Sequence, residues 1–193
     1  MRRFALALLG SILVVGCTQM ETKPPAKVAK DGDLAAPADY RTWPKFLTDI
    51  QRPDAKQIRD IYINPVGAKA TPGKPFPDGT IFVMENYAAK ELPDGTLAKG
   101  PDGKLVKGQL VRVFVMGKGK GWGESVTTEL RNGDWVYAAY LADGKPAADP
   151  IPPCRACHLP LVEKDYVHRY DEYFQKRAAA PGAPQKPAGG YGY

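Results

Sequence analysis

The sequence predicts an α+β domain that consists mainly of an antiparallel β-sheet with a few flanking helices. Apolar and β-branched residues form four short runs, and clusters of Gly, Pro, Asp and Asn separate them. Helical periodicity, by contrast, is found only towards the two ends of the domain. We therefore expect a sheet of about four or five strands, with the runs at residues 58–64, 80–90, 109–117 and 134–141.

The first element of the domain is expected to be an amphipathic helix over residues 40–50. Trp43, Phe46, Leu47 and Ile50 recur at spacings of three and four residues, which is the periodicity of one helix face. Pro44 suits the first turn of such a helix, because the N–H that proline lacks has no partner there.

In the later segments, side chains of different kinds alternate as in β-strands, and turn-forming residues separate the segments. Valines alternate with other side chains over residues 111–116, and aromatic and aliphatic residues share one face over 135–141. Residues 166–177 are expected to form a closing helix or turn region. Turns are predicted at the three Pro-Asp-Gly sequences, 77–79, 93–95 and 101–103, and at residues 132–134.

The N-terminal residues predict export. Arg2 and Arg3 precede an apolar run, residues 4–15, that is too short to span a bilayer. The run leads into Val14-Val15-Gly16-Cys17, which resembles a bacterial lipobox. We expect residues 1–16 to be a lipoprotein signal peptide and Cys17 to be lipidated, the alternative being an ordinary cleaved signal with an incidental cysteine.

Composition divides the rest of the chain. Residues 17–38 are rich in Pro, Ala and Lys and are expected to be a lipidated, flexible tether. Residues 178–193 have the same character and are expected to be a disordered tail, which leaves one folded domain over 39–177. Thr18 follows the lipobox cysteine, and the resemblance to lipoproteins then favours an outer-membrane anchor, with the domain facing the bacterial periplasm.

Cys154-Arg-Ala-Cys157-His158 is a C-x-x-C-H motif, the attachment sequence of a c-type haem. In this arrangement both thiols are joined covalently to the haem and the histidine is an axial iron ligand. A disulfide, a redox dithiol and a zinc site are the alternatives, although a zinc site needs further ligands and His168 is the other histidine. We expect one covalent haem c near the C-terminal end of the domain.

The net charge does not indicate a nucleic-acid partner. The formal charge is +6, but two of the positive charges are the signal arginines. The two haem propionates would offset about two more, and the remaining basic residues form no dense cluster. We expect a solvated, mildly basic surface and no nucleic acid.

The position of the motif argues against the commonest small cytochromes. Those proteins are helical, carry the motif near the start and supply a methionine ligand after it. In this chain the motif follows a β-rich body and no methionine follows the motif.

Six short motifs occur in order along the chain: Tyr40-Arg-Thr-Trp43, Arg59-Asp-Ile-Tyr-Ile-Asn-Pro65, Asp78-Gly-Thr80, Asn132-Gly-Asp-Trp135, Cys154 to His158 and Asp165-Tyr166-Val167. Together they resemble the cytochrome P-460 family, which includes the cytochromes c′-beta. The resemblance extends over residues 40–175 and implies a mostly antiparallel sheet with one c-type haem, commonly in a homodimer. It also implies that His158 is the proximal ligand and that the distal side of the iron is often open.

Members of that family differ in whether a lysine is joined to the haem edge. Members with a lysine joined to the haem edge oxidise hydroxylamine, whereas c′-beta members lack the link and bind nitric oxide beneath an apolar cap. The best register places Met84 where the lysine stands, and strand alternation puts Phe82 on the same face. We expect Phe82 and Met84 at the haem, the alternative being that they are packed core residues.

Three functions remain open. The leading one is a pentacoordinate haem that binds or processes nitric oxide or a related nitrogen species. The others are a hydroxylamine-oxidising enzyme of the lysine-linked type and an electron-transfer cytochrome with His158 and Met84 as axial ligands. The expected partners are a small ligand at the iron, an unidentified redox protein, the membrane and a second copy of the chain.

His168 is a rival sixth ligand, but it lies ten residues after His158, on the segment that leaves the proximal side. A surface or propionate-contacting position is therefore favoured for His168. Three arginines are further candidates for the propionates, although arginines on sheets and loops usually face solvent: Arg59, Arg112 and Arg155.

Overall fold

The computed structural model describes residues 28–180. The predicted signal peptide, the predicted lipidation site Cys17 and most of the predicted tail lie outside the described residues. Within the described part, no helix is long and apolar enough to cross a membrane.

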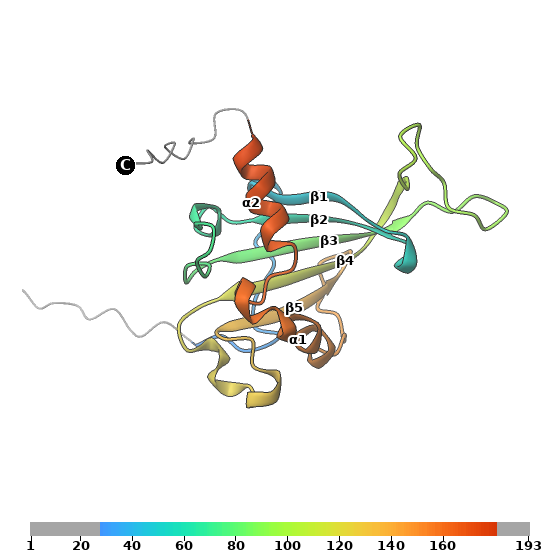
Figure 1. Ribbon diagram of the computed structural model, residues 1–193. Coiled ribbons are helices and arrows are strands. Elements are labelled where there is room, and N and C mark those ends of the chain that lie inside the picture. Colours follow the sequence, from blue (N-terminus) through green and yellow to red (C-terminus); the bar gives the residue numbers. More distant parts are fainter. Residues whose placement is uncertain (1–27, 181–193) are drawn as a thin grey trace, which may run out of the picture.

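A five-stranded antiparallel sheet forms the body of the domain, with its strands in chain order (Figure 1). The strands are β1 (Lys45–Arg52), β2 (Gln57–Ile63), β3 (Ile81–Ala89), β4 (Lys107–Lys118) and β5 (Trp135–Leu141). Each strand pairs with the next one along the chain; the β1–β2 connection is short, whereas those over residues 64–80, 90–106 and 119–134 are longer. The predicted α+β class and the four predicted strands, which correspond to β2–β5, are confirmed.

Two α-helices follow the sheet, α1 (Pro152–His158) and α2 (Tyr170–Ala179). The second confirms the predicted closing helix. The other helical segments are single 3₁₀ turns or short runs of them, at Tyr40–Thr42, Pro53–Ala55, Gly67–Lys69, Trp122–Ser125, Thr128–Leu130 and Leu159–Lys164.

The helix predicted over residues 40–50 is wrong, because most of that segment is strand β1. Leu47 pairs with Ile61 and Ile50 pairs with Arg59, so Leu47 and Ile50 share a face although they are three residues apart. The register shifts between these pairs, at Asp49, whose φ of 54° is left-handed. The irregular strand therefore reproduces the spacing of a helix face.

The glycines of the three Pro-Asp-Gly sequences confirm the predicted turns. Gly79, Gly95 and Gly103 have φ values of 86°, 82° and 77°. Residues with a Cβ rarely adopt this conformation, which explains why glycine ends each of the three sequences.

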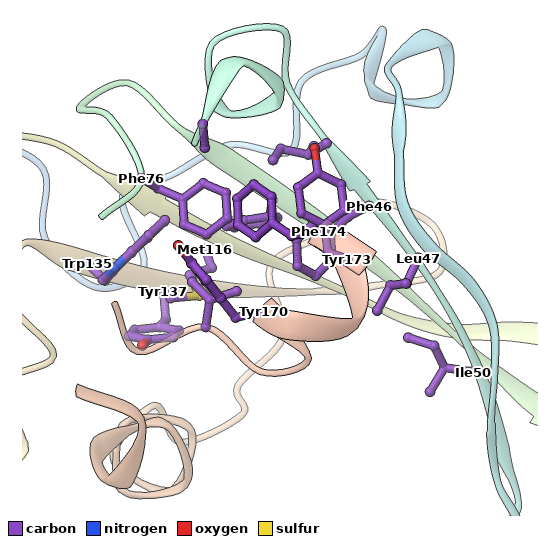
Figure 2. Close-up of a cluster of buried hydrophobic side chains, with 14 residues drawn as sticks. Phe46, Leu47, Ile50, Phe76, Met116, Trp135, Tyr137, Tyr170, Tyr173 and Phe174 are labelled. Atoms are coloured by element: carbon purple, nitrogen blue, oxygen red, sulfur yellow. The ribbon is translucent and has the colours of Figure 1, made fainter. Parts of the chain in front are cut away.

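The two helices pack on one face of the sheet, here called the helical face. Tyr173 of α2 stacks on Phe46 with ring centroids 4.3 Å apart, and Phe174 stacks on Phe76 at 6.1 Å. Figure 2 shows these rings together over the strands, with Trp135 and Tyr137 nearby. This aromatic cluster is the main hydrophobic core of the domain.

The opposite face carries a second apolar cluster and a buried carboxylate, Glu85. The hydroxyls of Tyr40 and Tyr87 each donate to Glu85 at 2.7 Å, that of Tyr62 donates at 3.1 Å, and Arg41 forms an ion pair at 2.7 Å. Burial alone would raise the pKa of Glu85, but the hydrogen bonds from Tyr40, Tyr87 and Arg41 outweigh it and lower the pKa overall.

The domain begins earlier than predicted, since part of the expected tether packs on the sheet. The backbone N–H of Gly32 donates to the carbonyl of Tyr137 at 2.8 Å, and Leu34 is buried in the second cluster. The carboxylate of Asp31 forms an ion pair with Arg155. Residues 31–34 therefore belong to the folded unit.

Candidate functional site

The C-x-x-C-H motif lies on α1, which starts with Pro152 and Pro153. Positions three and four apart are neighbours on a helix surface, so Cys154, Cys157 and His158 share one side of α1. Cys154 is partly buried and Cys157 is exposed, and within residues 28–180 both are free thiols. The two sulfur atoms are thus available to a common ligand.

His158 is held in a single tautomer. Its Nδ1 lies 2.6 Å from the carbonyl oxygen of Tyr166. A carbonyl can only accept, so Nδ1 carries the proton and Nε2 is left with its lone pair. Burial lowers the pKa of His158 to about 4, so the ring is neutral at pH 7. A neutral imidazole with Nδ1 bound to a carbonyl and Nε2 free is the form that ligates a metal.

The carbonyl of Tyr166 is itself fixed by the neighbouring residue, Asp165. Asp165 and Tyr166 have left-handed φ values of 50° and 61°, which turn the chain sharply after α1. The carboxylate of Asp165 accepts hydrogen bonds from the backbone N–H of Phe76 and from Lys118, each at 2.8 Å. The Asp165–Tyr166–Val167 motif therefore anchors the acceptor that orients His158.

Arg155, between the two cysteines, fixes α1 from its other side. Its side chain is 2% exposed and forms a bidentate ion pair with Asp31, with both contacts at 2.7 Å. It also donates to the carbonyl of Trp135 at 3.1 Å. Arg155 does not face solvent as most arginines do, and its charge is already neutralised by a residue of the N-terminal segment.

Asn132, from the Asn-Gly-Asp-Trp motif, connects α1 to β5. Its side chain is buried and donates to the carbonyl of Arg155 at 3.2 Å, while it accepts from the hydroxyl of Tyr137 at 3.0 Å. The ring of Tyr137 contacts that of His158 at 5.3 Å. Sequence reasoning gave these two residues no role, although the Asn132 motif was recognised as a signature.

Strand register arranges the helical face beside α1 into three rows, each crossing β2, β3, β4 and β5. The core row consists of Ile63, Phe82, Met116 and Tyr137. The apolar row consists of Ile61, Met84, Phe114 and Ala139. The polar row consists of Arg59, Asn86, Arg112 and Leu141.

The core row is buried in the aromatic cluster, whereas most side chains of the other two rows are only partly covered. In Figure 1, α2 crosses the sheet near the start of β3, and neither α-helix lies over the part of β3 towards the long β3–β4 connection. The apolar row is therefore the apolar, partly exposed part of the helical face.

Phe82 and Met84 share a face, as alternation predicts, but their surroundings differ. Phe82 is 5% exposed and packs against Phe46, Phe76 and Trp135 at centroid distances of 4.9–5.7 Å. It is a member of the hydrophobic core. Met84 is half-buried in the apolar row, on the same face as α1, and presents free surface there.

His168 lies next to the motif and on the same side as His158. Its Nε2 is 3.5 Å from the sulfur of Cys157, and its ring centroid is 4.7 Å from that of His158. Two imidazoles in direct contact leave no room for a porphyrin between them. This geometry agrees with the expectation that His168 is poorly placed as a sixth ligand.

A zinc site of the usual kind is not formed by the described residues. Within 28–180, no group of three or more His, Cys, Asp or Glu side chains is placed to hold a metal ion. The cysteines and His158 thus stand together without the further protein ligands that structural zinc requires.

Comparison with known families gives the identification. The family model for cytochrome P460 matches residues 37–169, which is most of the chain. The chain belongs to the cytochrome P460 family. It is therefore a haem protein of the P460 and cytochrome c′-beta kind. A comparison with curated proteins gives no match.

The residues of this P460 domain fit a haem. His158 has a free, neutral Nε2, two unpaired thiols lie on the same side of α1, and a partly open apolar row extends from the same face of the sheet. A porphyrin is a flat apolar group with two carboxylates at its edge, and the apolar and polar rows lie side by side in the matching order.

Proposed function

We propose that this P460 protein is a monohaem cytochrome with one haem c attached through Cys154 and Cys157 and with His158 as an axial ligand. The observation that carries the proposal is the hydrogen bond from Nδ1 of His158 to the carbonyl of Tyr166, since it leaves Nε2 free for iron. When bound, the haem would supply an iron centre that takes a small ligand or exchanges electrons.

We propose small-ligand binding without a lysine cross-link as the leading function. The three rows of the helical face contain no lysine, and the register expected for the cross-linking lysine holds Met84. Ile61, Met84 and Phe114 offer an apolar surface, which favours an uncharged ligand such as nitric oxide, since none of these three side chains can donate a hydrogen bond to an anion.

Hydroxylamine oxidation of the lysine-linked type is less well supported. Such a reaction needs an acid or base to move protons. The nearest carboxylate in sequence to Met84 is Glu85, which lies on the opposite face and is enclosed by three tyrosines and Arg41. The three rows contain no carboxylate of their own.

Electron transfer is the second candidate, and one observation favours it. Met84 lies on the helical face of the sheet, where α1 also packs, and it is only half-buried, so its thioether is accessible on that face. A methionine ligand would raise the reduction potential and exclude exogenous ligands. Met84 thus distinguishes the two candidate functions.

The proposal also includes lipidation of Cys17, which would anchor the protein, in the outer membrane by preference, with its domain facing the periplasm. It further includes assembly as a homodimer. They depend on the N-terminal sequence and on the family resemblance.

Absorption and electron paramagnetic resonance spectra of the haem-loaded protein, with and without nitric oxide, would test the proposal. We expect a high-spin ferric haem that binds nitric oxide and is unchanged in Met84→Leu. A low-spin ferric haem that ignores nitric oxide in wild type, and becomes high-spin in Met84→Leu, would replace ligand binding by electron transfer. A strongly red-shifted ferrous Soret band would show that a cross-link exists.

Met116→Leu is the matched control for these spectra. Met116 lies on the same face of the sheet but in the buried core row. We expect its replacement to leave the spin state unchanged under either function, since leucine keeps the apolar volume.

A further inference from the structure

Arg59 stands out in the polar row because two neutral side chains hold its guanidinium. Its Nε donates to the amide oxygen of Asn86 at 3.1 Å, and its Nη2 donates to the amide oxygen of Gln57, also at 3.1 Å. Asn86 in turn donates to Gln57 at 3.0 Å. This closed triangle fixes the direction of the Arg59 side chain without neutralising its charge.

Four other arginines of the domain are paired with acids, whereas Arg59 is not. Arg52, Arg112, Arg155 and Arg169 form ion pairs with Asp54, Asp149, Asp31 and Glu172. No described carboxylate forms an ion pair with Arg59. Of the five N–H groups of a guanidinium, those of Nη1 and one of Nη2 have no described protein acceptor.

The surroundings make this unpaired charge costly. Burial lowers the pKa of Arg59 and the positive charge of Arg52 lowers it further, while the carboxylate of Asp54, which is paired with Arg52, acts in the opposite direction without reversing the shift. Arginine nevertheless stays protonated in proteins, so the cation persists in a half-buried position. A counter-anion at the free N–H groups would remove this cost.

The position of Arg59 connects it with the proposed haem face. Arg59 precedes Ile61 by two residues, so it is next to the apolar row on the same face of β2, and it pairs with Asn86, two residues from Met84. Arg59 also interacts electrostatically with Cys157, the second cysteine of the motif.

We propose that Arg59, oriented by Asn86 and Gln57, binds an oxygen anion that lies against the apolar row. The proposal rests on the proposed function, because it places the haem on the helical face. The anion is a carboxylate at the haem edge or an oxyanion ligand such as nitrite, and the two share the chemistry of a charged oxygen that accepts hydrogen bonds. Arg155 and Arg112 already have carboxylate partners, Asp31 and Asp149.

The test compares haem-loaded wild type with Arg59→Gln and Arg59→Lys, and uses Arg112→Gln as the matched control from the same row. The first measurement is the midpoint potential from pH 5 to pH 9. If Arg59 binds a haem carboxylate, Arg59→Gln raises the pKa of that carboxylate into this range. Its potential then shows an additional fall as pH rises, because the deprotonated carboxylate favours the ferric state. Arg59→Lys restores part of the wild-type profile.

The second measurement is titration of the ferric proteins with sodium nitrite, followed by absorption. If Arg59 binds an exogenous anion, Arg59→Gln weakens nitrite binding by about tenfold or more, which is the loss expected for a charge-assisted hydrogen bond. The potential of this variant then follows pH as wild type does. In both cases Arg112→Gln resembles wild type.

An Arg59→Gln protein with wild-type potentials at every pH and wild-type nitrite affinity would overturn the proposal and leave the proposed function intact. A wild-type protein that carries no covalent haem, judged by haem stain after denaturing electrophoresis, would overturn both. Equal effects of Arg59→Gln and Arg112→Gln would also refute a special role for Arg59.

Discussion

The ion pair between Asp31 and Arg155 gives the sharpest test of how α1 is held in place. Replacing Asp31 with alanine leaves the Arg155 guanidinium, which is 2% exposed, without its carboxylate. It also removes the acceptor of the Tyr137 backbone N–H at 3.0 Å. Arg155 keeps its contacts to the backbone carbonyls of Leu130 and Trp135 and to the ring of Tyr137, none of which carries a negative charge.

The size of the effect follows from this burial. Removing one partner of a buried ion pair costs about 3–5 kcal/mol. The Asp31 side chain is 27% exposed, so water can enter the space that it leaves. We therefore expect the lower end, about 3 kcal/mol, or a fall in melting temperature of about 6–12 °C for a domain of this size.

The assay is urea unfolding followed by far-ultraviolet circular dichroism. Asp149→Ala serves as the control, because Asp149 pairs with Arg112 while both side chains are 34% exposed, and an exposed pair contributes less than about 1 kcal/mol. The double variant Asp31→Ala/Arg155→Met should be more stable than Asp31→Ala, since it removes the unpaired charge. Asp31→Ala and Asp149→Ala with equal losses of stability would refute the reasoning.

Three further predictions concern the rest of the domain. Glu85→Gln should cost about 2 kcal/mol of folding free energy at pH 7. The folded-state pKa of Glu85 is lowered, so the stability that its charged form contributes is present above its ordinary pKa of 4.5 and is lost as pH falls through the folded-state pKa. Urea unfolding at low pH should therefore show a smaller difference between the variant and wild type. Tyr137→Phe should cost about 1–3 kcal/mol in the same assay, because Asn132 loses a hydrogen bond in a buried site; wild-type stability would contradict this. Gly123→Ala should fail to give a cooperative thermal transition, since its Cβ would lie 1.8 Å from the carbonyl oxygen of Gly133; normal melting would show that the backbone can move.

Local patterns determined most of what the sequence could predict. The four runs of β2–β5 follow from alternation, and the turns at Gly79, Gly95 and Gly103 follow from a backbone conformation that glycine adopts easily. The C-x-x-C-H motif was identified from its spacing alone, although the helix α1 that carries it was not predicted. These features depend on neighbours in the chain.

Contacts between distant segments decided the rest. The sequence of β1 resembled that of a helix because its apolar residues are three and four positions apart. Only the pairing with β2, whose register shifts between Leu47 and Ile50, explains this spacing in a strand. Phe82 and Met84 are equivalent by alternation, and packing against Phe46, Phe76 and Trp135 buries Phe82, whereas Met84 stays half-buried. In each case the deciding partner is far away in the sequence.

The chemistry of the motif shows the same division. The sequence by itself determined that two cysteines and one histidine stand together, since all three lie between positions 154 and 158. Only the tertiary structure decided that His158 has a free Nε2, because the acceptor of its Nδ1 is the Tyr166 carbonyl beyond a sharp left-handed turn. It also decided that Arg155 has a carboxylate partner, because Asp31 comes from a distant part of the chain. Arg59, by contrast, is held by the neutral side chains of Asn86 and Gln57.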